Sequence, residues 1–211
     1  MRHLPLAVAL AGAGWACHEP TLPPNHTPAY AFDYFGDVFH WPTSRLPVRY
    51  FADTRGAMRA YVANALTQWQ QQFLYGEFSG ILMNDSAHAD VIVVWADSVP
   101  PDVPPDEGPP VKACGGNTMT TFDAAGAALD SPIHTSLTVL ASPATPAQLA
   151  ACMRRTVIHE LGHTLGLFKE APDSILAVMN ATPLVKTPTD NDRRTVEVLY
   201  HTPPTIAPPP R

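Results

Sequence analysis

The run ADVIVVWAD, residues 89–97, constrains the fold of this chain more than any other segment. Its centre is an unbroken series of β-branched and aromatic side chains, and side chains of this kind favour strands. A strand that lacks the usual alternation of apolar and polar residues is typically buried on both faces within a sheet. We therefore expect residues 89–97 to form a strand buried on both faces.

Three other segments have the short apolar or alternating pattern of strands. They are residues 46–51, 118–123 and 133–140. An apolar stripe at helical spacing begins at Met58 and predicts a helix that is broken by Gly76. Between these elements, the proline-rich residues 99–110 predict a surface loop, because proline cannot take part in regular structure there.

Two more helices are predicted from their capping residues. Thr145 and Gln148 form a capping box with Pro146 at the first helical position, which predicts a helix from about Pro146 to Leu165. Thr189 is the predicted cap of a last helix near the end of the chain. The order of strand, helix, strands and helix indicates an α+β fold in which helices pack on a mixed sheet.

The first 17 residues have the layout of an export signal. Arg2 precedes the apolar stretch from Leu4 to Ala13, and small residues follow it. Cys17 stands where a bacterial lipoprotein signal has its lipid-bearing cysteine, and simple cleavage after Ala16 is the alternative. We expect an exported protein that is extracellular, periplasmic or anchored to the cell envelope, with a lipid on Cys17 as its only attachment to a membrane.

The remainder divides into three parts. Residues 18–40 are polar and proline-rich and predict a tether, residues 41–201 carry the predicted domain, and residues 202–211 predict a loose tail. Cys114 and Cys152 are an even pair in an oxidising compartment, so we expect a disulfide between them, with two unrelated buried thiols as the alternative. That bridge would contribute roughly 4 kcal/mol in the chain-entropy model.

Overall composition excludes some partners. The net charge is -6, so the chain has no basic surface on which to base nucleic-acid binding. No internal stretch is apolar for the length that a membrane span requires. We expect a globular monomer.

The segment HELGH, residues 159–163, has the spacing of a metal site. His159 and His163 are four residues apart and lie on one helix face, so both imidazoles can reach one zinc ion at about 2.0–2.1 Å. Glu160 is rotated about 100° from His159 and is placed to accept a proton from a metal-bound water instead. This pattern is that of a zinc protease, and Glu160 is its predicted catalytic base and acid.

The chain resembles the metzincin metallopeptidases, in particular their matrixin-like bacterial members. HELGHTLGL is similar to the start of their zinc motif, and ILAVMNATP around Met179 resembles their methionine turn. The likeness covers roughly residues 41–201, including RLPVRYF, YVANALTQWQ, ADVIVVW and TDNDRRTVEVLYH. It implies a zinc-dependent endopeptidase with a horizontal cleft that takes a protein or peptide substrate, and it places Met179 beneath the metal.

The resemblance leaves the third zinc ligand open. The family's usual spacing places a histidine at position 169, where this chain has Lys169. Deprotonating a lysine costs about 4–5 kcal/mol at neutral pH, so Lys169 is a poor ligand. Related sequences with one more residue would place the ligand at Glu170, and zinc accepts a glutamate beside two histidines. Asp173 is the alternative.

A rival hypothesis follows from the same departure. A relative that has lost the standard third histidine can keep the fold and bind a partner or peptide without cleaving it. Retention of Glu160 favours the enzyme, because a purely structural zinc site needs no general base.

Overall fold

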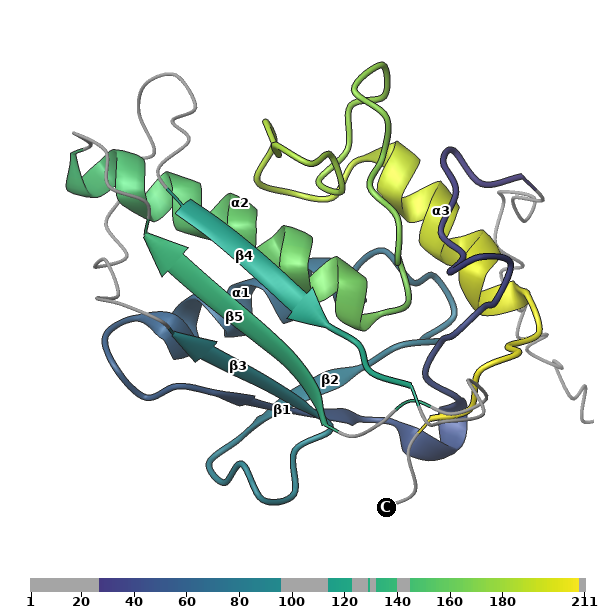
Figure 1. The fold of residues 1–211 in the computed structure, drawn as a ribbon, viewed down its shortest axis with the longest axis horizontal. Coiled ribbons are helices and arrows are strands. Elements are labelled where there is room, and N and C mark those ends of the chain that lie inside the picture. Colours follow the sequence, from purple (N-terminus) through teal and green to yellow (C-terminus); the bar gives the residue numbers. More distant parts are fainter. Residues whose placement is uncertain (1–26, 96–113, 123–128, 130–131, 140–144, 209–211) are drawn as a thin grey trace, which may run out of the picture.

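A five-stranded mixed sheet with helices on one side forms the body of the protein (Figure 1). The computed structural model describes residues 27–95, 114–122, 129, 132–139 and 145–208. The strand order is β2-β1-β3-β5-β4. All neighbouring pairs are parallel except β4 and β5, which are antiparallel. The strands are β1 (Val48–Ala52), β2 (Gly80–Met83), β3 (Val91–Trp95), β4 (Cys114–Met119) and β5 (Ile133–Val139).

The strands follow the sequence pattern with several differences. Strands β3 and β5 lie within the predicted segments, β1 overlaps residues 46–51 but ends one residue later at Ala52, and β2 was not predicted. Strand β4 begins at Cys114 and ends at Met119, whereas we expected residues 118–123. Strand β3 is buried on one face only, because Val91 and Val93 are fully buried while Val94 is 37% exposed. The expectation of burial on both faces is therefore wrong among the described residues. Helices α1 and α2 both pack on the same face of the sheet, and the face that carries Val94 is not covered by either of them (Figure 1).

Three α-helices were predicted, and three occur in the described part of the chain. They are α1 (Met58–Gln70), α2 (Pro146–Thr164) and α3 (Asp190–His201). The capping box of α2 forms as predicted, with the Thr145 side chain accepting from the Gln148 backbone and Pro146 in the first turn. Thr189 caps α3 in the same way. None of the helices in the described ranges is long and apolar enough to cross a membrane.

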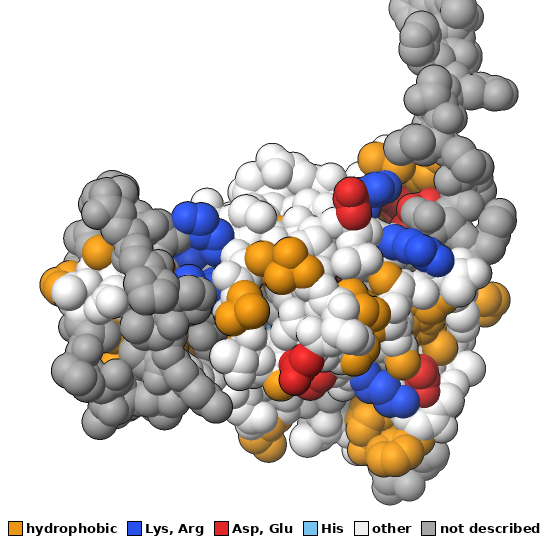
Figure 2. Space-filling model, turned by 90° about the horizontal axis from the view of Figure 1, so that it is seen from above, with side chains coloured by type: hydrophobic (Ala, Val, Ile, Leu, Met, Phe, Trp, Pro, Cys, Tyr) orange, Lys and Arg blue, Asp and Glu red, His pale blue; other side chains and the backbone are white. Residues whose placement is uncertain are grey.

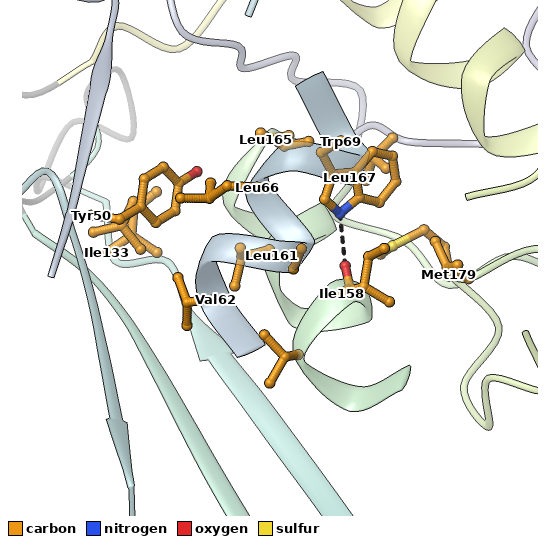
Figure 3. Packing of buried hydrophobic residues seen from close by; sticks show 14 of the residues in the cluster. Tyr50, Val62, Leu66, Trp69, Ile133, Ile158, Leu161, Leu165, Leu167 and Met179 are labelled. Atoms are coloured by element: carbon orange, nitrogen blue, oxygen red, sulfur yellow. Dashed lines mark hydrogen bonds between the residues drawn. The ribbon is translucent and has the colours of Figure 1, made fainter. Parts of the chain in front are cut away.

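Helices α1 and α2 share one core with the sheet (Figure 3). Trp69 of α1 is fully buried, and its indole nitrogen donates to the Ile158 carbonyl of α2 at 2.8 Å. Leu161 and Leu165 of α2 pack beside Leu66 of α1 in the same view. This packing fixes α2 against the sheet, so the end of α2 that carries HELGH is held from two sides.

The ends of the domain extend beyond the predicted limits. We expected residues 18–40 to be a tether, but in its described part Tyr30 and Phe39 are buried in the core. Residues 202–211 were expected to be loose, yet Ile206 is 2% exposed and its backbone donates to the Val38 carbonyl. Apolar burial accounts for both differences. The export signal, Cys17 and the predicted loop at 99–110 lie outside the described residues.

Candidate metal centre

The two histidines of HELGH meet at the end of helix α2. Their Nε2 atoms are 3.2 Å apart, and the rings stand nearly perpendicular to each other, at 89°. The helix turns sharply just beyond them, at Gly166, which has a φ of +104°. A Cβ at that position would lie 2.0 Å from the Phe39 carbonyl oxygen, so the turn requires glycine.

Backbone carbonyls fix the orientation of both imidazoles. His159 Nδ1 lies 2.9 Å from the Val178 carbonyl oxygen, and His163 Nδ1 lies 2.6 Å from that of Leu167. A carbonyl can only accept, so each Nδ1 is the protonated nitrogen. Each Nε2 then presents its lone pair to the space between the rings. This is how proteins orient histidine ligands toward a metal ion.

Glu170 joins the histidines from the other side of that space. Its carboxylate oxygens lie 3.5 Å from His159 Nε2 and 3.6 Å from His163 Nε2. Partial burial would raise the pKa of Glu170, but its contacts with the two imidazoles outweigh burial and lower the pKa to about 2. Burial would lower the pKa of His159, and contact with Glu170 outweighs this and raises it. Glu170 is therefore ionised at neutral pH.

The spacing of these three groups fits zinc. Two ligand atoms on a tetrahedral zinc ion, each at about 2.0–2.1 Å, are separated by about 3.4 Å. The three measured separations, 3.2, 3.5 and 3.6 Å, are close to that value. Two neutral imidazoles and one carboxylate are also a donor set that catalytic zinc accepts, with a position left for water. The residues therefore fit the metal.

The other third-ligand candidates lie elsewhere. Lys169 points away and pairs with Asp33 at 3.5 Å. Asp173 is exposed and lines a separate surface cavity with Ser174. Of the residues in the described ranges, only His159, His163 and Glu170 form a group of this kind.

Glu160 lies beside the metal group but points toward strand β4. It is 4% exposed, and its Oε2 atom accepts a hydrogen bond from Thr118 Oγ1 at 2.7 Å. A Cβ at Gly116 would lie 2.4 Å from the Glu160 side chain, so only glycine leaves room for this carboxylate. The site thus has two carboxylates. Glu170 is a candidate metal ligand, and Glu160 accepts a hydrogen bond from Thr118 of strand β4.

An irregular segment after the helix, residues 166–183, supports Glu170 and the ring of His159. The Asn180 side chain donates to the carbonyls of Ala171 and Ile175 and accepts from the Ala177 backbone. Met179 is fully buried and lies next to Ile158 and Trp69, beneath α2 (Figure 3). The position beneath a metal that the family resemblance implies for Met179 stays a prediction.

One buried carboxylate that the sequence analysis missed holds this segment in place. Asp192 is fully buried and accepts from the Val178 backbone at 3.0 Å and from the Tyr30 hydroxyl at 2.7 Å. The Val178 carbonyl is the group that orients His159. Asp192 therefore acts on the site through Val178. Its position three residues after the Thr189 cap is the only sequence signal for it.

Two cavities meet at the metal group and together form one cleft along strand β4. The first, of about 210 Å³, is lined by Cys114, Arg155 and Pro183 as well as by site residues. The second, of about 310 Å³, is lined by Tyr34, Asn117 and Phe168. We call them the arginine lobe and the aromatic lobe. Glu160 and Glu170 line both lobes, so a chain lying in the cleft would pass the metal group.

The predicted cysteine pair lies at the inner wall of the arginine lobe. Cys114 of β4 and Cys152 of α2 are both buried, and both are free thiols rather than a disulfide. A hydrogen bond with Cys152, and then burial, raise the pKa of the Cys114 thiol well above its usual range. The two sulfurs lie close together, as the expected pair requires, but no disulfide joins them.

Charge is sparse on the outer surface near these elements. On the face shown in Figure 2, charged side chains occur in small groups among hydrophobic and neutral ones, and the described part of that face has no broad patch of one sign.

Comparison with known proteins adds no assignment. A search against protein-family models and a search of the curated proteins found no match to this chain.

Proposed function

We propose that the protein is a zinc-dependent endopeptidase of the metzincin type, and that it is exported. The observation that carries the proposal is the meeting of His159, His163 and Glu170 beside Glu160 in a cleft. The two imidazoles have free Nε2 lone pairs, and the carboxylate completes a three-ligand set. Bound there, zinc would polarise the scissile carbonyl and make its water more acidic.

Strand β4 provides a surface for an extended peptide. It is one of the two edge strands of the sheet within the described residues, and its residues line both lobes of the cleft. An extended chain can add to such an edge through backbone hydrogen bonds, which bind any sequence. Side chains on either side of the cleaved bond would then enter the arginine lobe and the aromatic lobe. This arrangement suits the interior of a polypeptide.

Glu160 would move the protons. Glu160 lines both lobes, so its carboxylate could take a proton from the attacking water and deliver it to the leaving amine. Thr118 holds Oε2 by a hydrogen bond and thereby limits the rotation of the carboxylate. Oε1 has no such partner within the described residues and is the atom that we assign to proton transfer.

Hydrolysis of a mixed peptide library, followed by mass spectrometry, tests the proposal. We expect the zinc-supplied protein to cleave peptides internally, and a chelator to stop cleavage until zinc is restored. Glu160→Gln should lower the rate by about 10²–10⁴-fold. Glu77→Gln, a change of the same kind outside the cleft, should leave the rate unaltered. A zinc-loaded protein that binds peptides but cleaves none would instead be the binding protein of the rival hypothesis.

A further inference from the structure

Arg155 is a buried cation in the wall of the cleft. It lies on α2 four residues before His159, so the two side chains share one face of the helix. The side chain lines the arginine lobe, and the residue is 9% exposed. Sequence analysis gave no reason to single it out, because an arginine on a helix is normally solvated.

Within the described ranges, Arg155 has no hydrogen-bond or ion-pair partner. Burying a guanidinium without a partner is costly, since water is removed from the charge and nothing replaces it. None of its nitrogens is a fully enclosed polar atom without a partner. The guanidinium therefore keeps some exposure, and the residue lines the arginine lobe. The guanidinium is therefore available to a group that enters from the cleft.

The neighbours of Arg155 leave that position to an outside anion. Cys114 and Cys152 line the same lobe as free cysteines, and the raised pKa of the Cys114 thiol keeps that group neutral. Glu160 and Glu170 line the same lobe, but Glu160 is bonded to Thr118 and Glu170 to the two histidines. Neither carboxylate forms an ion pair with Arg155.

Among the described residues that line it, the aromatic lobe has no arginine or lysine. Tyr34 and Phe168 form its wall, with ring centroids 5.9 Å apart. The nearest lysine in sequence, Lys169, pairs with Asp33 and is not a lining residue. Recognition of an anion is thus confined to one side of the metal group.

We propose that Arg155 binds a carboxylate of the substrate, so that the cleft selects peptides with an acidic residue next to the cleaved bond. A guanidinium can bind a carboxylate through two parallel hydrogen bonds, which suits a side chain of Asp or Glu. The free C-terminal carboxylate of a short peptide has the same chemistry. The inference deepens the proposed function and rests on it for the cleavage step, but not for binding.

Binding is measured on zinc-supplied Glu160→Gln protein, which keeps Arg155 and should not consume its ligand. The probes are peptides blocked at both ends, in which Glu replaces Gln at each position in turn. We expect Glu at one position to improve affinity by about 10- to 100-fold. Adding Arg155→Gln should abolish that preference. Adding Arg154→Gln, the neighbouring residue that lines neither lobe, should leave it intact.

A second set of peptides identifies the source of the carboxylate. If unblocking the C-terminus raises affinity, and internal Glu does not, the ligand is a terminal carboxylate and Arg155 still binds it. Equal affinity for Glu and Gln peptides at every position, with no effect of the free terminus, would overturn the inference. So would a Glu preference that survives Arg155→Gln.

Stability separates recognition from a structural role. Replacing an unpartnered buried charge should not lower the melting temperature, so we expect Arg155→Met to melt at or above the wild-type temperature. A structural arginine would show the opposite shift. If Arg155→Gln does not fold, the same preference for Glu over Gln peptides is measured on the charge-preserving Arg155→Lys variant instead. If no peptide is hydrolysed, the proposed peptidase function is refuted, but a measured preference for Glu peptides would still support anion binding by Arg155.

Discussion

Helix α2 and the irregular segment 166–183 face each other across the candidate metal centre. The helix is largely buried, whereas the segment mixes exposed residues with buried ones such as Val178 and Asn180. The helix satisfies its backbone internally, and side chains such as Trp69 add bonds to it. The segment has a single isolated bridge, between Ala171 and Asn180, in place of a ladder. Several of its other backbone groups bond to individual side chains, chiefly those of Asn180 and Asp192.

This difference shows where the site is vulnerable. A helix loses little when one side chain changes, because its backbone bonds do not depend on that side chain. In a segment without periodic structure, removing a supporting polar side chain leaves a buried backbone group without its hydrogen-bond partner. Substitutions of the polar side chains that support the segment should therefore disturb both stability and metal binding.

Asp192→Ala should have the largest effect on stability. It removes the acceptor of the Tyr30 hydroxyl and of the Val178 backbone in the interior. We expect a loss of about 3 kcal/mol in the free energy of unfolding, measured by urea denaturation. Asp190→Ala is the control, because that carboxylate is exposed in the same first turn and should change stability by less than about 0.5 kcal/mol. A loss below about 1 kcal/mol for Asp192→Ala would contradict the account.

Asn180→Ala should be the next most harmful change. The amide bonds to the Ala171, Ile175 and Ala177 backbones, and the residue is 6% exposed. We expect about 2 kcal/mol of lost stability and a zinc dissociation constant raised about 10-fold, measured by competition with a chelator. Asn191→Ala, which removes an exposed bond to the same region, should change neither quantity appreciably.

Thr145→Ala should have the smallest effect. It removes the side-chain cap of α2, at the end of the helix far from the histidines. We expect about 1 kcal/mol of lost stability and an unchanged zinc affinity. Thermal unfolding and the same chelator competition measure both. If Thr145→Ala lowered zinc affinity as much as Asn180→Ala, the claim that the helix is less sensitive to side-chain loss than the irregular segment would be wrong.

The sequence was sufficient for the parts of the fold that are periodic or capped. The boundaries of α2, the start of α3 and the alternation in β5 follow from capping residues and apolar spacing alone. Strand β2 was missed because four residues, with Ile81 exposed, are too short to show a pattern. The start of β4 was misplaced because Gly115 and Gly116 disfavour a strand. Gly116 is there because Glu160 needs the space.

The candidate site was predictable in the same uneven way. His159, Glu160 and His163 share a helix, so their spacing predicts their geometry. Glu170 was proposed from the resemblance and its alternatives, and the structure brings it to both imidazoles. Asp192 and Arg155 could not have been found, because their roles depend on contacts between residues distant in the chain. No local pattern reports such contacts.

Zinc content of Glu170→Ala, with Asp173→Ala as the matched control, tests the central claim most directly. The claim is that a helix supplies two ligands and the irregular segment the third. Proteins purified without added metal and analysed for elements should contain about one zinc ion per chain for the wild type and for Asp173→Ala. Glu170→Ala should contain far less. Full zinc in Glu170→Ala would contradict the claim and place the third ligand elsewhere.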